Sequence, residues 1–197
     1  MIIGAKIFSN IELYSELSSY GKFSIQIIFA PDKNLGGYIN KLTGRKMLLW
    51  DGVCTVHDAI EAKNVLKTKQ LYPNVPVIAH PECNSGLLDI CDFIGSTNAM
   101  LNFIKKSDNK QFIIATESGI LYQMKKDNPD KEFISVEGAN GCKCVDCADM
   151  KFNTLEKLYD CLDKESPEII MSDDMIEKAA KPILKMLEIS KNLGIIK

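Results

Sequence analysis

The clearest indication of the fold class is the stretch Val75-Pro76-Val77-Ile78-Ala79-His80-Pro81-Glu82. It is an apolar run that ends abruptly in two polar residues separated by a proline. An unbroken run of branched apolar residues is typical of a strand that is covered on both faces. Strands of this kind occur in parallel sheets, where ligand-binding residues follow the carboxyl end of the strand. The sequence therefore predicts a buried parallel strand with a candidate site at its end.

The same pattern recurs along the chain, and predicted strands alternate with predicted helices. Strands are predicted at residues 25–30, 46–50, 75–79, 93–96, 111–116, 132–136 and 168–171. Helices are predicted at residues 11–20, 35–42, 56–71, 86–91, 99–106, 119–126, 154–162 and 174–193. Repeated alternation predicts an α/β fold built from three-layer α/β/α units, with parallel sheets and right-handed crossovers.

Three short motifs occur twice in the same order along the chain. The matching positions are Ser9 and Ser96, Ala30 and Ala115, and Cys54 and Cys142, at offsets of 87, 85 and 88 residues. This spacing indicates an internal repeat, although chance similarity between two α/β units would produce the same pattern. We expect α/β units at residues 1–55 and 56–197. The first is expected to be incomplete at its amino-terminal side, because no strand and helix precede Ser9 as they precede Ser96.

The composition is that of a globular protein and argues against several classes of partner. Hydrophobic residues make up 46% of the chain and its net charge is -2, which gives no electrostatic reason to expect nucleic acid. No apolar run approaches the roughly 20 residues that a membrane helix requires. No signal peptide is visible, so we expect a cytoplasmic protein. Seven cysteines in that reducing compartment suggest metal binding or catalysis rather than disulfides.

The cysteines at the ends of the two repeat units are the candidates for metal binding. Cys54 follows a predicted strand, and the second unit ends in Cys142-Lys143-Cys144-Val145-Asp146-Cys147. This spacing suits thiolate ligation of zinc or of an iron–sulfur cluster. The alternative is a loop of three half-exposed thiols. Cys91 and Cys161 fall on predicted helices beside leucine and isoleucine, where cysteine acts as a small apolar residue.

Both histidines of the chain lie at or just after predicted strand ends. A first helical turn places His57 on the same side as Cys54. Pro81 fixes the turn between His80 and Glu82, so an imidazole and a carboxylate leave the end of one strand. Such a pair can do general acid–base work on a small substrate. Taken singly, each histidine is more often structural.

Polar residues also follow two other predicted strands. Gly95-Ser96-Thr97-Asn98 joins a strand to a helix, and its hydroxyl and amide groups suit a phosphate or a carboxylate. The same residues are ordinary helix caps. Thr116-Glu117 offers a further carboxylate or a structural hydrogen bond. Because the chain has neither GxGxxG nor a P-loop, nucleotide binding has no support.

In this order, these motifs resemble those of the quinolinate synthase family. The resemblance rests on Ala30-Pro31-Asp32-Lys33-Asn34-Leu35-Gly36, Trp50-Asp51-Gly52-Val53-Cys54-Thr55-Val56-His57, His80-Pro81-Glu82-Cys83, Gly95-Ser96-Thr97, Ala115-Thr116-Glu117-Ser118-Gly119 and Cys147-Ala148-Asp149-Met150-Lys151-Phe152-Asn153-Thr154-Leu155. It covers essentially the whole chain. It implies the second and third of three α/β domains related by a pseudo-threefold axis.

The resemblance implies an enzyme that condenses iminoaspartate with dihydroxyacetone phosphate to quinolinate, phosphate and water, in the biosynthesis of NAD. It also implies a [4Fe–4S] cluster held by three cysteines, one from each domain, with one iron left open as a Lewis acid. By motif position, Cys54 and Cys147 are ligands in this chain, and Cys142 and Cys144 are neighbours. The third cysteine belongs to the first domain, which is not part of these residues.

Active-site positions of the family fall on a small set of residues. The implied substrate-binding residues are Ser9, His57, His80, Glu82, Ser96 and Thr97. Of these, His57, His80 and Glu82 are implied to be catalytic, with Glu82 as a general base. Ser9 matches only loosely.

We therefore expect an enzyme of this family that acts on two small molecules and is incomplete by itself. A separate chain would then supply the missing domain. Two alternatives stay open. One is a non-catalytic zinc or iron–sulfur module that uses Cys142, Cys144 and Cys147, and the other is an inactive truncated homologue.

Overall fold

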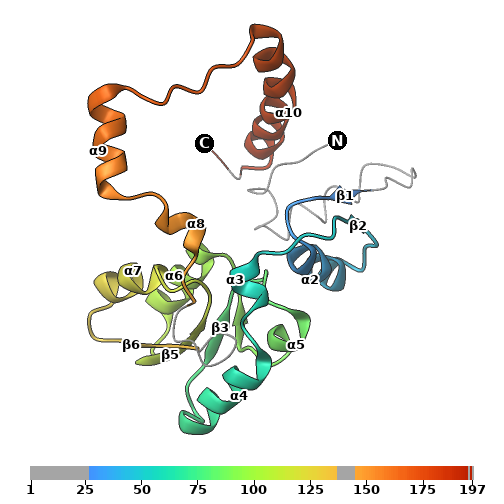
Figure 1. Ribbon diagram of the computed structural model, residues 1–197. Helices are drawn as coiled ribbons and strands as arrows, with labels where there is room; N and C mark the ends of the chain where they lie inside the picture. The colour runs from blue at the N-terminus through green and yellow to red at the C-terminus, as the bar shows by residue number, and fades with distance from the viewer. Residues whose placement is uncertain (1–26, 137–144, 195, 197) are drawn as a thin grey trace. The chain divides into compact units, whose positions relative to one another are not determined.

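The computed structural model describes residues 27–136, 145–194 and 196 (Figure 1). The chain divides into two compact units, one formed by Ile25–Asp146 and the other by Met1–Ser24 with Cys147–Lys197. The division at residue 55 stays a prediction. The predicted helix at residues 11–20 and Ser9 lie outside the described residues.

A small parallel sheet begins the first of these units. It consists of the strands β1 (Ile28–Phe29) and β2 (Leu48–Leu49), which are connected by the helix α2 (Lys33–Thr43). The helix begins at residue 33 because the carboxylate of Asp32 accepts a hydrogen bond of 2.7 Å from the backbone N–H of Leu35. It ends at Gly44, whose φ of 69° lies in the left-handed region that favours glycine. The helix packs closely on the sheet, since a Cβ on Gly36 would lie 2.6 Å from the Leu49 side chain.

A four-stranded sheet forms the larger part of the same unit. Its strands are β3 (Val77–Ala79), β4 (Phe93–Ile94), β5 (Gln111–Ala115) and β6 (Glu132–Ser135). Its helices are α3 (Thr55–Asp58), α4 (Ala62–Leu71), α5 (Ser85–Leu88), α6 (Thr97–Lys106) and α7 (Ile120–Asp127). The strands lie in the order β4-β3-β5-β6, and every pair is parallel. The predicted parallel α/β architecture is confirmed.

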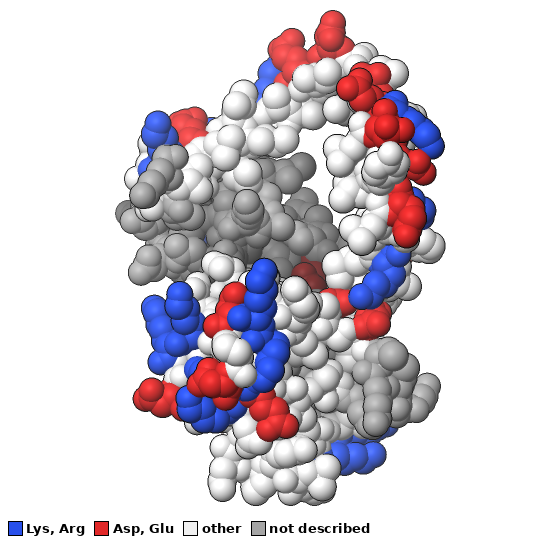
Figure 2. Space-filling view, turned by 90° about the vertical axis from the view of Figure 1, so that its left-hand side faces the viewer, with Lys and Arg blue, Asp and Glu red and all other residues white. Residues whose placement is uncertain are grey.

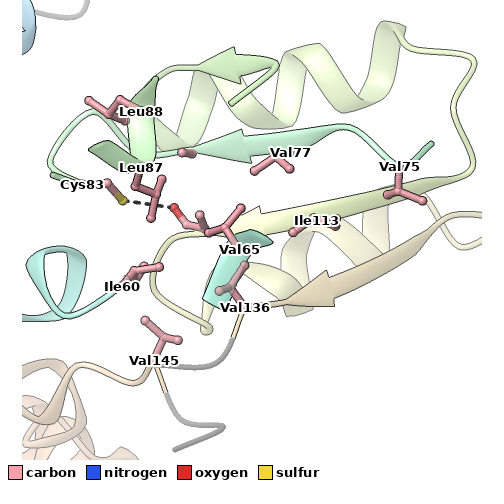
Figure 3. Close-up of a cluster of buried hydrophobic side chains, with 12 residues drawn as sticks. Ile60, Val65, Val75, Val77, Cys83, Leu87, Leu88, Ile113, Val136 and Val145 are labelled. Atoms are coloured by element: carbon pink, nitrogen blue, oxygen red, sulfur yellow. Dashed lines mark hydrogen bonds between the residues drawn. The ribbon is translucent and has the colours of Figure 1, made fainter. Parts of the chain in front are cut away.

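Both faces of this sheet are buried, as the unbroken apolar runs predict. Side chains of one face are Val77, Ala79, Ile113 and Ala115, and those of the other are Ile78, Phe112 and Ile114. The first face packs against α4 and α5 through Val65, Leu87 and Leu88 (Figure 3). The second packs against α6 and α7 through Met100, Ile104 and Met124. Burying each of these larger side chains contributes about 1.5–3 kcal/mol, which makes the three-layer sandwich the stable arrangement.

The strand order has a consequence for the position of the site. From β3 the chain passes to β4 on one side, and it then crosses to β5 on the other side. The carboxyl ends of β3 and β5 therefore lie at a topological switch point, where open α/β sheets bind ligands. His80 follows β3 and Thr116 follows β5.

The two sheets contain matching βαβ units. β1, α2 and β2 form a parallel pair with one crossover helix, and β5, α7 and β6 do the same. These are the segments that the Ala30/Ala115 match relates. The architecture therefore agrees with the internal repeat.

The predicted helix at residues 56–71 is wrong in one respect, because the structure divides it into α3 and α4. Glu61 adopts an extended conformation (φ −90°, ψ 136°) between the two helices. The carbonyl of Ile60 is held there by the Asn84 side chain at 3.1 Å, which competes with helical hydrogen bonding.

The second unit contains α8 (Ala148–Lys151), α9 (Leu155–Lys164) and α10 (Asp173–Asn192). The predicted strand at residues 168–171 is wrong. Ile169 and Ile170 are 86% and 81% exposed, and no strand of the described residues pairs with them. An apolar run without a neighbouring strand cannot satisfy its backbone in a sheet.

Acidic and basic side chains lie interspersed on the face drawn in Figure 2. Along α9 and α10 several of them pair one helical turn apart, as Lys164 does with Asp160 and Lys178 with Asp174. None of the helices in the described part of the chain combines the length and the apolar character needed to cross a bilayer.

A buried lysine closes the carboxyl end of α6 and yields a stability prediction. Nζ of Lys131 donates hydrogen bonds of 2.6 Å to the carbonyls of Ile104 and Ser107, and Lys131 is only 7% exposed. Lys131→Met leaves both carbonyls without this donor, so the free energy of unfolding should fall by about 2 kcal/mol in urea denaturation. Lys110→Met is the control, because it removes only an exposed ion pair with Asp130. Equal losses in both variants would contradict this account of Lys131.

Candidate functional site

Five polar side chains meet at the carboxyl edge of the sheets in the Ile25–Asp146 unit. They are Cys54, His57, His80, Glu82 and Thr116. They come from three chain segments, each of which follows a strand. The structure thus brings together His57, His80, Glu82 and Cys54, which the sequence singled out.

The position of Cys54 depends on one buried carboxylate. Asp32 is 2% exposed, and its Oδ2 accepts a hydrogen bond of 2.7 Å from the backbone N–H of Cys54. Its Oδ1 caps α2 at Leu35. A further bond of 2.8 Å, from the backbone N–H of Lys33 to the carbonyl of Gly52, holds the same two segments together. Asp32 therefore fixes both the start of α2 and the backbone that carries the thiol.

Each ring nitrogen of His57 faces a polar side chain, but only one of them forms a hydrogen bond. Nε2 lies 2.9 Å from Oγ1 of Thr116, and both residues are buried. Nδ1 lies 3.0 Å from Oε2 of Glu82, but the oxygen is too far off the ring direction to form a regular hydrogen bond. The Thr116 contact fixes the orientation of the ring, and Nδ1 faces the carboxylate.

His80 stacks on His57, with ring centroids 4.4 Å apart and an interplanar angle of 17°. Its Nδ1 accepts a hydrogen bond of 3.4 Å from the backbone N–H of Glu82, so the proton of the neutral ring lies on Nε2. Burial is the main cause that lowers the pKa of His80 to about 4. The charge of His57 also lowers this pKa, and Glu82 opposes the shift. His80 is therefore neutral near pH 7.

Glu82 is held in its ionised form. Its contact with His57 is the main cause that lowers its pKa, burial opposes the shift, and His80 and the neighbouring Cys54 thiol also contribute to the lowering. The Asn34 side chain fixes the Glu82 backbone by donating to its carbonyl at 3.1 Å, and it also donates to Asp58 at 3.0 Å. A half-buried carboxylate beside a neutral imidazole can accept a proton from a bound molecule.

A donor set for a metal ion is present at this edge. The Cys54 thiol, a ring nitrogen of His57 and a carboxylate oxygen of Glu82 lie within 4.8 Å of one another. Cys54 is half-buried, so its sulfur can face a group that approaches from outside. Cys147 precedes α8 in the other unit and is also half-buried. Cys142 and Cys144 lie outside the described residues.

Ser96 and Thr97 stand at the carboxyl end of β4. Oγ of Ser96 accepts a hydrogen bond of 3.3 Å from the backbone N–H of Ala99, so Ser96 is the cap of α6. Thr97 is the exposed first residue of the helix. Capping explains Ser96 structurally, and binding of an anion at this helix end stays a prediction.

The other cysteines of the described residues divide into two kinds. Cys83 donates to the carbonyl of Ala115 at 3.5 Å, and burial raises the pKa of its thiol (Figure 3). Burial also raises the pKa of Cys91 to about 12. Both are neutral packing residues, as expected for Cys91. The same expectation is wrong for Cys161, whose side chain is exposed on α9.

Sequence reasoning missed Asp32 and Asn34 as residues that hold the site. Asp32 carries a recognisable signal, since an aspartate three residues before Leu35 is typical of a helix cap. Asn34 carries none, because its contacts are with residues 24 and 48 positions away. Glu117 makes a local hydrogen bond of 2.7 Å to the backbone N–H of Gly119.

The pKa of His80 gives the site a predictable pH dependence. The unfolded chain binds a proton at His80 near pH 6.5, whereas the folded chain does so near pH 4. The free energy of unfolding should therefore rise between pH 4 and pH 6.5, and His80→Gln should reduce this rise. In NMR titration the His80 ring should titrate near pH 4, and Glu82→Gln should lower its pKa further because the opposing carboxylate is lost. A ring that titrates near 6.5 would contradict this electrostatic description.

Comparison with known proteins identifies the family. A family model described as "Quinolinate synthetase A protein" matches residues 17–188. The quinolinate synthase of Chloroherpeton thalassium is 50% identical over 167 residues, which are 84% of this chain and 52% of that protein. That of Microcystis aeruginosa is 48% identical over 164 residues, which are 83% of this chain and 51% of that protein. That of Synechocystis sp. is 47% identical over 165 residues, with 84% and 52% covered.

The chain thus spans about half the length of the curated relatives it matches. The matched region contains the strand ends that carry Cys54, His57, His80, Glu82 and Thr116. Since the family match extends over most of the sequence, the chain belongs to the quinolinate synthase family.

Proposed function

We propose that this chain carries part of the active site of a quinolinate synthase, which condenses iminoaspartate with dihydroxyacetone phosphate in NAD biosynthesis. The observation that supports this most is the meeting of Cys54, His57, Glu82 and Thr116 at the edge where parallel sheets bind ligands. Membership of the quinolinate synthase family supports this choice of reaction.

The proposal includes a [4Fe–4S] cluster with Cys54 and Cys147 as ligands. The half-buried Cys54 thiol, beside an ionised carboxylate and at an open edge, fits such a role. When bound, the cluster supplies a Lewis-acidic iron. Two thiolates are too few for it, and since Cys142 and Cys144 are taken as neighbours of the site, the proposal places the third ligand outside these 197 residues. A longer form of the chain or a separate chain can supply that ligand, in the cytoplasm where thiols stay reduced.

The side chains at this edge have distinct proposed roles. Glu82 is the general base, because its carboxylate is ionised and partly accessible. His57, locked by Thr116, positions Glu82. His80 offers the N–H of its Nε2 to a substrate oxygen without carrying a charge.

Substrate anions are proposed to bind at two further places. The amino-terminal end of α6, with Ser96 and Thr97, suits a phosphate or carboxylate, because its first backbone N–H groups have no partner within the helix. Ser9 is proposed as a contact from its motif position, and it lies outside the described residues.

A chimaera provides the test of the proposed function. This chain replaces the matching half of the Chloroherpeton thalassium protein, and the product is reconstituted anaerobically with iron and sulfide. We expect the visible absorption of a cluster and formation of quinolinate. Cys54→Ser and Cys147→Ser should remove both signals, whereas Cys161→Ser, on the exposed face of α9, should keep them. A folded chimaera that holds a cluster but makes no quinolinate would contradict the proposal.

The role of Glu82 is tested in the same chimaera. Glu82→Gln keeps the shape of the side chain but removes the proton acceptor, so kcat should fall by about 10²–10⁴-fold while cluster absorption is unchanged. Glu132→Gln is the control, since Glu132 is exposed on β6 and its side chain accepts a hydrogen bond from Gln111. An unchanged kcat in Glu82→Gln would exclude Glu82 as the base.

A further inference from the structure

The Nδ1 atom of His57 is a buried polar atom that has no hydrogen-bond partner among the described residues. The residue is 8% exposed, and the other ring nitrogen is already used by Thr116 at 2.9 Å. Oε2 of the charged Glu82 side chain lies 3.0 Å from Nδ1 of His57. A buried nitrogen left in this state is destabilising, so the arrangement calls for a partner.

Neither tautomer of the neutral ring satisfies this contact. If Nε2 carries the proton and donates it to Thr116, the lone pair of Nδ1 faces the ionised carboxylate of Glu82. If Nδ1 carries the proton, its N–H does not point at the carboxylate oxygen. A cation bound to both Nδ1 and Oε2 satisfies the first arrangement fully.

A third donor completes a ligand set around the same point. The Cys54 sulfur lies within 4.8 Å of the donor atoms of His57 and Glu82. Ligands of a tetrahedral zinc ion are about 3.3–3.8 Å apart, given bond lengths of about 2.0–2.3 Å. Rotation of the Cys54 and Glu82 side chains brings the three donor atoms to this spacing. One thiolate and one carboxylate also neutralise a divalent charge.

The orientation of His57 is that of a metal-binding histidine. In such residues the second ring nitrogen usually donates to an oxygen, which fixes the ring and raises its basicity. Thr116 provides that oxygen from the end of β5. His80 does not compete for the ion, because its Nδ1 already accepts from the Glu82 backbone.

We propose that Cys54 Sγ, His57 Nδ1 and a Glu82 oxygen form a site for a single divalent ion of the Zn²⁺ type, with Thr116 as the residue that positions the ring. Cys54 and Glu82 are half-buried, which leaves a fourth position open to water. The site goes beyond the proposed function, because it needs one cysteine, no sulfide and no residue outside Ile25–Asp146. Cys54 cannot serve this ion and a cluster at once, so the ion occupies the edge only while the cluster is absent.

Cobalt is the probe for this site, because Co²⁺ takes the same ligands as Zn²⁺ and is coloured. The metal-free 197-residue chain is titrated anaerobically with Co²⁺ alone, and the thiolate-to-cobalt charge-transfer band and the visible ligand-field bands are recorded. We expect one equivalent to bind in tetrahedral form, and one equivalent of Zn²⁺ to displace it.

The variants assign the ligands. Cys54→Ser should abolish the charge-transfer band, and since serine is a good helix cap, α3 should still form. Glu82→Gln should weaken binding at least tenfold. Thr116→Val should weaken it about 10–100-fold and Thr116→Ser should restore it, because serine keeps the hydroxyl. Cys147→Ser and Cys83→Ala are the matched controls and should bind as the parent chain does.

Circular dichroism shows which variants are folded. The cobalt spectra of the folded variants then decide whether the metal binds at the proposed site. A band lost in Cys54→Ser and weakened in Glu82→Gln, but kept in Cys147→Ser, supports the site. A band that survives Cys54→Ser, or one that the folded Cys147→Ser variant loses, assigns the metal wholly or partly to other cysteines and overturns the proposal. Absence of any band in the folded parent chain also overturns it.

Discussion

The hydrogen bond between Nε2 of His57 and Oγ1 of Thr116 joins two segments that are 59 residues apart in the sequence. One segment follows β2, in the small sheet, and the other follows β5, in the larger one. Because β3 lies beside β5, the bond also places the His57 ring on His80, which follows β3. Glu82 then lies against both rings. Together with the stacking on His80, this bond fixes the direction of His57 Nδ1.

The strand order is what makes that bond possible. In the order β4-β3-β5-β6 the chain reverses direction across the sheet between β4 and β5, so the loops after β3 and β5 diverge and leave a crevice. Burial of the site follows from the two-faced core beneath it, and that burial causes the low pKa of His80. Asp32 performs the corresponding task in the small sheet, where one carboxylate sets both α2 and Cys54. The strand order therefore determines which side chains meet at the site, and these side chains determine its chemistry.

Local sequence patterns predicted most of this arrangement, and their failures have physical reasons. The apolar runs at β3 and β5 are confirmed because strands buried on both faces leave an unbroken signal. The run at residues 168–171 carries the same signal but has no neighbouring strand in the described residues, so it forms none. Which strand ends meet depends on strand order, which no local pattern encodes, and so the pairing of His57 with Thr116 could not be predicted. The motif resemblance singled out Cys54, His57, His80 and Glu82, which the structure brings together, but the supporting Asp32 and Asn34 emerged only from contacts.

The proposed metal site requires that Thr116 holds His57 with its proton on Nε2, which leaves the lone pair of Nδ1 directed at Glu82. Nitrogen-15 NMR of the imidazole rings in the metal-free chain measures this most directly, because protonated and unprotonated ring nitrogens have well-separated shifts. The account predicts that His57 is protonated at Nε2 near neutral pH, with slow exchange of that proton in the parent chain and faster exchange in Thr116→Val. A His57 ring protonated at Nδ1, or an Nε2 proton whose exchange is unaffected by Thr116→Val, would contradict it.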